Sequence, residues 1–362
     1  MKLSIKTSVL QNLVTHAMRG ASNNKMIPIT GFMAIDLQDS VLTLTTTDAY
    51  NYFYVREYDV AGDDFHIVVQ TELFSKLVTR MTCETVILET DRTMLKVIGN
   101  GEYSIELPLN EDGEPVVYPK VLERDFDVVE ECDINLSAIK LITTTAKTSL
   151  ATTFEIPCYT GYYVGDNVIA TDTYKLCGIN MKLWNNASLV TPEMLDLVGS
   201  FVDEKIHIKV IDGALLFESK SCTVYGPLMD SIAEYQVDAI NGLLNTEFES
   251  SCVIGKDVLL QLLDRLSLFV GVYDKNGIYL TFTQDGLQVE SKRSNSVETI
   301  QYAESRNFKP FTCCIDIEMF MSQIKANTAD RLHIEYGRDN AIKITDGNVT
   351  QIIALLEDER IA

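Results

Sequence analysis

Two short segments place a carboxylate beside hydroxyl groups at the end of a predicted strand. Asp48 follows three threonines in TTTDAY, and Asp172 lies within ATDTYKL. Two carboxylates brought together could act as general acid and general base. The two segments occupy equivalent positions in successive copies of a repeat, however, and repetition favours turns in which the aspartate accepts backbone N–H groups. We therefore expect Asx turns at Asp48 and Asp172.

Other residues that could do chemistry are sparse. None of the histidines, His16, His66, His207 and His333, has the short spacing to Cys, Asp or Glu that a metal site needs. The motifs GxxxxGK[ST], GxGxxG, GxSxG and HExxH are absent, which argues against a nucleotide cradle, a nucleophile elbow and a zinc site on a helix. The sequence predicts a binding module without cofactor or metal; an enzyme with an unrecognised carboxylate site is the least favoured alternative.

Composition predicts a soluble cytoplasmic protein without a membrane partner. The chain has 362 residues and is 46% hydrophobic, yet no stretch reaches the roughly 20 apolar residues of a membrane span. Its eight cysteines lack CxxC spacing, which predicts reduced and mostly buried thiols. A net charge of -22 argues against nucleic-acid binding unless the charge is unevenly distributed.

Internal repetition organises the chain. A short helix followed by three strands occurs three times, with helices starting at residues 71, 191 and 316, which are 120 and 125 residues apart. A second unit, a strand followed by a longer amphipathic helix and more strands, begins near Ile5, Ile134 and Ile254. Both units thus recur with the same period, so a true internal repeat is favoured over a chance similarity between helix–strand segments.

The repeat predicts an α+β fold of three similar domains. Boundaries fall in the acidic stretches YPKVLERDFDVVEEC and INGLLNTEFESS, which gives domains 1–125, 126–246 and 247–362. Each domain is expected to have two helices against antiparallel sheets of six to eight strands in total. The six predicted helices cover residues 8–20, 72–81, 136–149, 191–200, 256–269 and 316–327.

The acidity lies outside the helices. The six predicted helices together carry +1, so the remainder carries -23, and only the helices would tolerate a polyanion. Ordinary solvated helix faces are the alternative for any single lysine. Acidic residues on the fourth and sixth helices either favour helix N-termini or make that surface weakly basic. The candidate DNA-facing residues are Arg19, Lys25, Lys76, Arg80, Lys140, Lys147, Arg265 and Lys325.

Two segments carry a family resemblance. NKMIPITGFMAIDLQDSVLTLTTTDAYNYFYV and VIATDTYKLCG resemble the first-domain and second-domain signatures of bacterial DNA polymerase III beta subunits, and the resemblance covers nearly the whole chain. It implies a non-catalytic sliding clamp, in which two copies pair head to tail as a six-domain ring around double-stranded DNA. The implied partners are a DNA polymerase and an ATP-driven clamp loader, which bind through a short peptide motif.

The resemblance also implies site residues. The partner-peptide groove would contain Phe154, Thr171, Thr173, Tyr174, Lys175, Leu176, Met319, Ile352, Ala354, Leu355 and Leu356. Here Tyr174 and Lys175 replace the usual His-Arg pair, and the final strand lacks the usual Met-Pro-Met. The dimer contact would join Phe269 and Val270 to the strand that contains Tyr103, Ile105 and Leu107.

One alternative from another functional class is a repeat-built structural or adhesion protein, such as a virion component, whose acidic sheets face solvent. It predicts no retention on closed DNA circles and no effect on polymerase run length.

Overall fold

A computed structural model describes residues 1–22, 24–91, 93–110, 112–294, 296–338 and 340–358. The chain divides into two compact units, residues 1–139 with 193–228 (unit 1) and residues 140–192 with 229–362 (unit 2). The division into domains 1–125, 126–246 and 247–362 stays a prediction. Within the described residues, no helix combines the length and hydropathy that a membrane crossing requires.

Seven α-helices occur in the described residues, and six match the predicted ones. They are α1 (Thr7–Ala17), α2 (Thr71–Thr79), α3 (Leu136–Thr145), α4 (Pro192–Gly199), α5 (Val237–Leu244), α6 (Lys256–Ser267) and α7 (Ile317–Ala326). The unpredicted helix is α5, which lies in the stretch expected to be an irregular boundary. The single-turn 3₁₀ helices are η1 (Met18–Gly20), η2 (Pro28–Gly31), η3 (Val121–Glu123), η4 (Lys147–Ser149), η5 (Pro157–Thr160), η6 (Asp230–Glu234) and η7 (Val272–Asp274).

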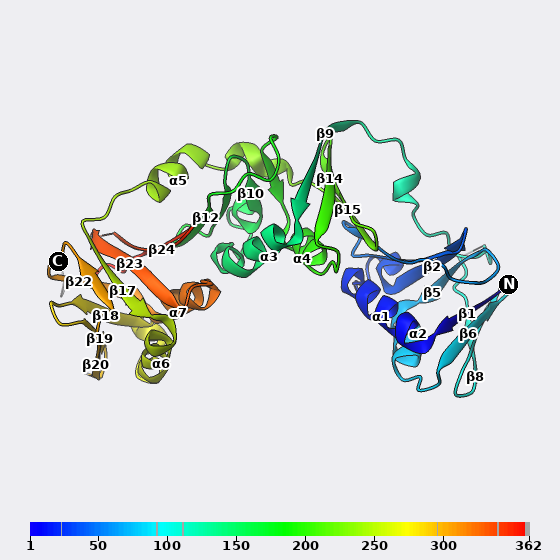
Figure 1. Ribbon diagram of the computed structural model, residues 1–362, viewed down its shortest axis with the longest axis horizontal. Coiled ribbons are helices and arrows are strands. Elements are labelled where there is room, and N and C mark those ends of the chain that lie inside the picture. Colours follow the sequence, from blue (N-terminus) through cyan, green and yellow to red (C-terminus); the bar gives the residue numbers. More distant parts are fainter. Residues whose placement is uncertain (23, 92, 111, 295, 339, 359–362) are drawn as a thin grey trace. The chain divides into compact units, whose positions relative to one another are not determined.

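Unit 1 contains two antiparallel sheets. One has the order β1-β6-β7-β8 and the other the order β5-β2-β3-β4-β16-β15-β14-β9. Figure 1 shows α1 and α2 side by side in this unit, and Gln11 Nε2 of α1 donates to Val78 O of α2 at 3.1 Å. The strands are β1 (Lys2–Lys6), β2 (Phe32–Gln38), β3 (Val41–Thr47), β4 (Tyr52–Glu57), β5 (Phe65–Gln70), β6 (Thr85–Thr90), β7 (Met94–Ile98), β8 (Glu102–Glu106), β9 (Val128–Asn135), β14 (Lys205–Ile211), β15 (Ala214–Glu218) and β16 (Cys222–Pro227).

Unit 2 also contains two antiparallel sheets. Their orders are β13-β10-β11-β12-β25-β24-β23-β17-β21 and β20-β19-β18-β22. The strands are β10 (Tyr162–Val164), β11 (Val168–Thr171), β12 (Lys175–Ile179), β13 (Ser188–Val190), β17 (Ser250–Gly255), β18 (Gly277–Phe282), β19 (Leu287–Ser291), β20 (Val297–Ile300), β21 (Glu304–Arg306), β22 (Phe311–Asp316), β23 (Arg331–Arg338), β24 (Ala341–Asp346) and β25 (Val349–Ala354).

The threefold repeat is confirmed by these elements. Strands β1, β9 and β17 are each followed directly by a longer helix, and the shorter helices α2, α4 and α7 are each followed by three strands. The first two predicted domains hold eight strands each, as expected. The third holds nine described strands, so the expected range of six to eight was too low there.

Apolar periodicity explains the helices. On α1 the buried residues Leu10, Leu13, Val14 and Ala17 recur at helical spacing, so one stripe faces the sheet. Asp316 caps α7, because its Oδ1 accepts the N–H groups of Glu318 and Met319 at 2.8 and 2.9 Å. At least one acidic residue of the sixth predicted helix therefore caps the helix N-terminus. This agrees with the first of the two interpretations, that the acidic residues favour helix N-termini.

The sheets join repeats through equivalent strands in one register. In unit 1, β4 pairs with β16, and Tyr52 lies opposite Tyr225. In unit 2, β12 pairs with β25, and Leu176 lies opposite Ile352. In each case the fourth strand of one repeat pairs with the last strand of the next, and the residue four positions after the turn aspartate takes the same place in the pairing. The fold therefore contains one junction geometry, used twice.

The cysteines are free, and six of the eight are buried, as the sequence predicts. Cys83 and Cys132 are partly exposed. Burial raises the pKa of the Cys177 thiol to about 12, which keeps it protonated and unreactive near neutral pH.

Candidate functional site

The two turn aspartates make matching hydrogen bonds. Asp172 Oδ1 accepts Tyr174 N at 2.9 Å and Lys175 N at 2.6 Å. Asp48 Oδ1 accepts Tyr50 N and Asn51 N at the same two distances. The expected Asx turns are therefore confirmed, and both carboxylates are committed to backbone N–H groups rather than to a shared catalytic site.

A threonine before each aspartate completes the turn. Thr171 Oγ1 donates to Lys175 O at 2.8 Å and accepts Thr173 N at 3.1 Å. Thr173 has a φ of +78°, in the left-handed region that non-glycine residues rarely adopt. Thr47 and Ala49 repeat this arrangement in unit 1, where Ala49 has a φ of +86°. The side-chain hydrogen bonds hold each turn in a conformation that its sequence does not otherwise favour.

The second of these turns forms one wall of a groove in unit 2. The groove has a volume of about 330 Å³ and lies between β12, the end of β25 and α5. Seven predicted groove residues line it: Thr171, Thr173, Tyr174, Lys175, Leu176, Ile352 and Ala354. Their convergence follows from the β12 and β25 pairing, because Leu176 and Ile352 are cross-strand neighbours on one face of the sheet.

Four predicted groove residues do not line it. Phe154 is 81% exposed in the segment before η5. Met319 and Leu355 are partly buried and pack against the core of the third repeat. Leu356 N donates to Cys314 O at 2.8 Å, which ties the chain after β25 to β22. A role in partner binding stays a prediction for all eleven residues.

Sequence reasoning missed a whole wall of the groove. The residues it did not name are Tyr159, Gln236, Ala239, Ile240, Leu243, Asn340 and Ala341. Four of them belong to α5 or to the residue just before it. The sequence signal for α5 is the helical spacing of Val237, Ile240 and Leu244. The stretch lies beside acidic residues and is only two turns long, which is typical of a linker.

The described lining of the groove is apolar apart from hydroxyl and amide groups and one lysine. Lys175 Nζ lies 3.0 Å from Asp172 Oδ2, and the two side chains are only 16% and 18% exposed. Because Lys175 is paired with Asp172, the lining of the groove carries little net charge. Exposed hydrophobic surface comes from Tyr174 and Leu243, which are 61% and 50% exposed.

The candidate DNA-facing cations divide into two groups. Lys76 forms an ion pair with Glu72, and Arg265 donates to both carboxylate oxygens of Glu298 at 2.9 and 2.6 Å. Those two charges are locally offset, which weakens their case as phosphate contacts. The other six lie exposed on or beside helical segments: Arg19, Lys25, Arg80, Lys140, Lys147 and Lys325. Contact with DNA stays a prediction for all eight.

The predicted dimer residues lie at or beside the ends of two sheets. Tyr103 and Ile105 belong to β8, an edge strand, and Leu107 directly follows it. Tyr103 is 41% exposed, whereas Ile105 and Leu107 are 4% and 8% exposed. Phe269 is 47% exposed after α6, next to Leu268 at 80%. Val270 packs partly against the core. The structure thus provides two unpaired edges with apolar side chains nearby.

Comparison with known proteins gives one family match and many structural ones. Residues 1–117 match the family model described as DNA polymerase III beta subunit, N-terminal domain. No curated protein sequence matches the chain. The beta subunit of Streptococcus pyogenes DNA polymerase is 16% identical with a TM-score of 0.86, covering 99% of this chain and 100% of that one. The Bacillus subtilis sliding clamp is 18% identical with a TM-score of 0.82, covering 99% of each chain.

A third similar structure is the Pseudomonas aeruginosa sliding clamp bound to griselimycin, 12% identical with a TM-score of 0.85 over 99% of this chain and 100% of that one. At such identities the structures establish the fold, which over nearly the whole chain is that of the sliding clamps. Residues 1–117 in addition match the N-terminal domain of the DNA polymerase III beta subunit family.

Proposed function

We propose that this chain closes with a second copy into a ring around duplex DNA and binds polymerases and a clamp loader through the groove of unit 2. The observation that carries the proposal is the repeated junction. The fourth strands β4 and β12 pair with the last strands β16 and β25, while the corresponding fourth strand β20 and last strand β8 have one free edge each. Pairing β20 of one copy with β8 of another would complete the same pattern.

The two internal junctions predict the register of that contact. Val297 of β20 occupies the same position in its hairpin as Tyr54 of β4 and Gly178 of β12. At the two internal junctions, Tyr54 lies opposite Thr223 and Gly178 lies opposite Thr350. The position in β8 that corresponds to Thr223 and Thr350 is Glu102. Val297 should therefore lie opposite Glu102 of the partner subunit. The exposed Phe269, whose backbone oxygen accepts Ser291 Oγ of β19 at 2.8 Å, supports an apolar contribution beside the strands.

Cysteines introduced at Glu102 and Val297 are expected to form a disulfide between subunits. Residues directly opposite in an antiparallel pair have Cα atoms about 4.5–5.5 Å apart, within the range that a disulfide bridges. Mild oxidation of the E102C/V297C variant should yield a covalently linked dimer on a denaturing, non-reducing gel. The matched control is E102C/T299C, displaced by two residues on the same face, which should cross-link poorly. Equal cross-linking of both pairs would contradict the register.

DNA retention tests the ring directly. The E102C/V297C dimer, oxidised in the presence of nicked circular DNA, should stay on the circle in high salt and leave once the DNA is cut to linear form. A topological link does not depend on counterions, whereas phosphate contacts weaken on circles and linear DNA alike as salt rises. Release from intact circles at the same rate as from linear DNA would reject the ring and favour a structural protein without a DNA role.

The groove supports binding of a short linear peptide. Its apolar lining, with two exposed hydrophobic side chains and a single neutralised lysine, suits leucine or phenylalanine anchors on an extended segment. Partners with such a segment would include the polymerase and an ATP-driven loader, and the clamp itself would need no cofactor. A cytoplasmic location follows from that role.

A further inference from the structure

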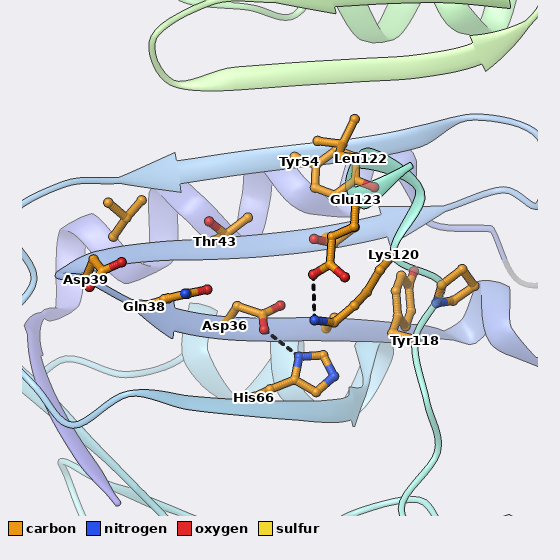
Figure 2. A pocket seen from close by; sticks show the side chains of 14 residues that line it. Asp36, Gln38, Asp39, Thr43, Tyr54, His66, Tyr118, Lys120, Leu122 and Glu123 are labelled. Atoms are coloured by element: carbon orange, nitrogen blue, oxygen red, sulfur yellow. Dashed lines mark hydrogen bonds and ion pairs between the residues drawn. The ribbon is translucent and has the colours of Figure 1, made fainter. Parts of the chain in front are cut away.

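A second cleft lies in unit 1, on the face of the eight-stranded sheet opposite to α1. This outer-face cleft has a volume of about 360 Å³, and its floor is formed by β2, β3, β4 and β5. Residues 118–123, which include η3, form a wall over the strands (Figure 2). Thr46 and Phe53 face α1, where Thr46 Oγ1 donates to Ala17 O at 2.6 Å, so their neighbours Thr45 and Tyr54 face the cleft. The cleft is separate from the groove and from both free edges.

Comparison of the repeats explains why the cleft is open. Ala34 lies opposite Thr45, and the corresponding cross-strand pair in the second repeat is Tyr163 opposite Ile169. There Tyr163 stacks on Tyr235 with ring centroids 5.2 Å apart, and this aromatic cluster fills the space above the sheet. Alanine and threonine at these positions leave the same space empty in the first repeat.

A buried hydroxyl group in this cleft lacks a partner. Tyr54 is 7% exposed, and its Oη forms no hydrogen bond within the part of the chain that the structure describes. Burial raises the pKa of Tyr54 far above its usual range, and the nearby N–H groups of Leu122 and Val121, which lower this pKa, do not reach hydrogen-bond geometry with Oη. A buried polar group left unsatisfied costs about 1–3 kcal/mol, so a ligand that satisfies Tyr54 would gain affinity.

The cleft is also acidic. Its lining has three carboxylates, Asp36, Asp39 and Glu123, against Lys120 and His66. His66 pairs with Asp36, and Lys120 Nζ lies 2.7 Å from Glu123 Oε1, as the dashed lines in Figure 2 mark. Asp39 forms no ion pair with any described residue. A cationic group beside Tyr54 would compete with Lys120 for the exposed Glu123, and Asp39 would add to the negative potential of the cleft.

We propose that the outer-face cleft binds the guanidinium group of an arginine from a partner polypeptide. A guanidinium has five N–H donors in one plane and no acceptor, which suits a site that offers carboxylates and hydroxyl oxygens. Glu123 supplies a carboxylate and Tyr54 a hydroxyl acceptor at one end of the cleft, as Figure 2 shows. Thr43 supplies a second hydroxyl group, and Asp39 adds negative charge from the other end. The planar group would also fit between the sheet and the wall formed by Pro119 and Leu122.

Ligand-observed NMR with the purified full-length chain tests this proposal. N-acetyl-arginine amide should bind to the wild-type protein, and N-acetyl-citrulline amide, which has nearly the same shape without the charge, should bind at least about ten-fold more weakly. Tyr54→Phe, which removes only the unpartnered hydroxyl, should weaken arginine binding about five-fold. Thr43→Phe, which fills the cleft from a partly exposed position, should abolish it.

Tyr58→Phe is the matched control, because Tyr58 Oη donates to Lys220 O at 2.7 Å outside the cleft. This variant should bind arginine amide as well as the wild type does. Equal binding of the arginine and citrulline amides, no binding of either, or unchanged binding in both Tyr54→Phe and Thr43→Phe would overturn the proposal. None of these readouts depends on DNA or on a second subunit, so the result is independent of the ring.

Discussion

Replacing Leu243 by aspartate is expected to weaken binding of a partner peptide about 30- to 100-fold and to leave the fold intact. Leu243 lines the groove from α5 and is 50% exposed in the free protein, so a carboxylate there remains solvated until a peptide docks. Docking would bury it against apolar anchors without a partner, which costs about 2–3 kcal/mol. The measurement is fluorescence anisotropy of a labelled peptide with adjacent leucine and phenylalanine anchors.

The matched control for this substitution is Val129→Asp. Val129 is 61% exposed on β9, outside the groove, and receives the same change in charge. It should bind the labelled peptide with wild-type affinity. If Leu243→Asp also binds like the wild type, α5 does not belong to the peptide site, and the binding surface must be confined to the strand residues that the sequence identified.

The strand side of this groove could be predicted from sequence, and the reason is local. ATDTYKL specifies its own turn, since Asp172 and Thr171 bond to backbone groups within four residues, and the turn fixes where β12 begins. The equivalent turn at Asp48, in the first repeat, makes the same hydrogen bonds and supports this interpretation. A motif of this kind predicts geometry without knowledge of any distant residue.

The helical side of the groove could not be predicted in the same way. α5 has only eight residues, and isolated helices of that length are marginal in water. Ile240 is buried within a cluster that includes Tyr235 and Leu176, so the helix is stabilised largely by tertiary packing. Because those contacts join segments more than sixty residues apart, the sequence around residue 240 indicated only a polar boundary.

Charge gave a partial prediction of the DNA-facing surface. The distribution of charged residues in the sequence distinguishes nearly neutral helices from acidic strands and loops. It does not reveal which side chains form ion pairs with one another. The structure pairs Arg265 with Glu298, which lies on β20 and is 33 positions away. Arg265 is a predicted phosphate contact, yet it is held by a carboxylate at the edge where the second subunit is proposed to join.

Gln323→Ala is expected to destabilise unit 2 by about 3 kcal/mol. Gln323 is fully buried at a position of α7 where the period requires an apolar residue, between Phe320 and Ile324. Ser149 Oγ donates to Gln323 Oε1 at 3.2 Å, and Gln351 Nε2 donates to the same atom at 3.1 Å. Alanine would leave these donors short of a partner and create a cavity, and the two effects add.

The single tryptophan provides the measurement. Trp184 is 2% exposed and belongs to unit 2, so its fluorescence during urea unfolding reports on the unit that contains Gln323. Gln261→Ala, at an exposed position of α6, is the control and should change the unfolding free energy by less than about 0.5 kcal/mol. Similar midpoints for the two variants would mean that the network contributes no net stability.

This network also has a consequence for the groove. Gln351 points into the network from β25, and the next residue, Ile352, points to the opposite face and lines the groove. Gln351 Nε2 also donates to the backbone oxygen of Gln323 at 3.0 Å, so the network fixes the strand that holds the apolar lining. Gln323→Ala should loosen this network and therefore weaken binding of the labelled peptide, even though Gln323 is not among the residues that line the groove. Unchanged peptide affinity alongside a clear loss of stability would show that β25 is held in place by its strand pairing alone.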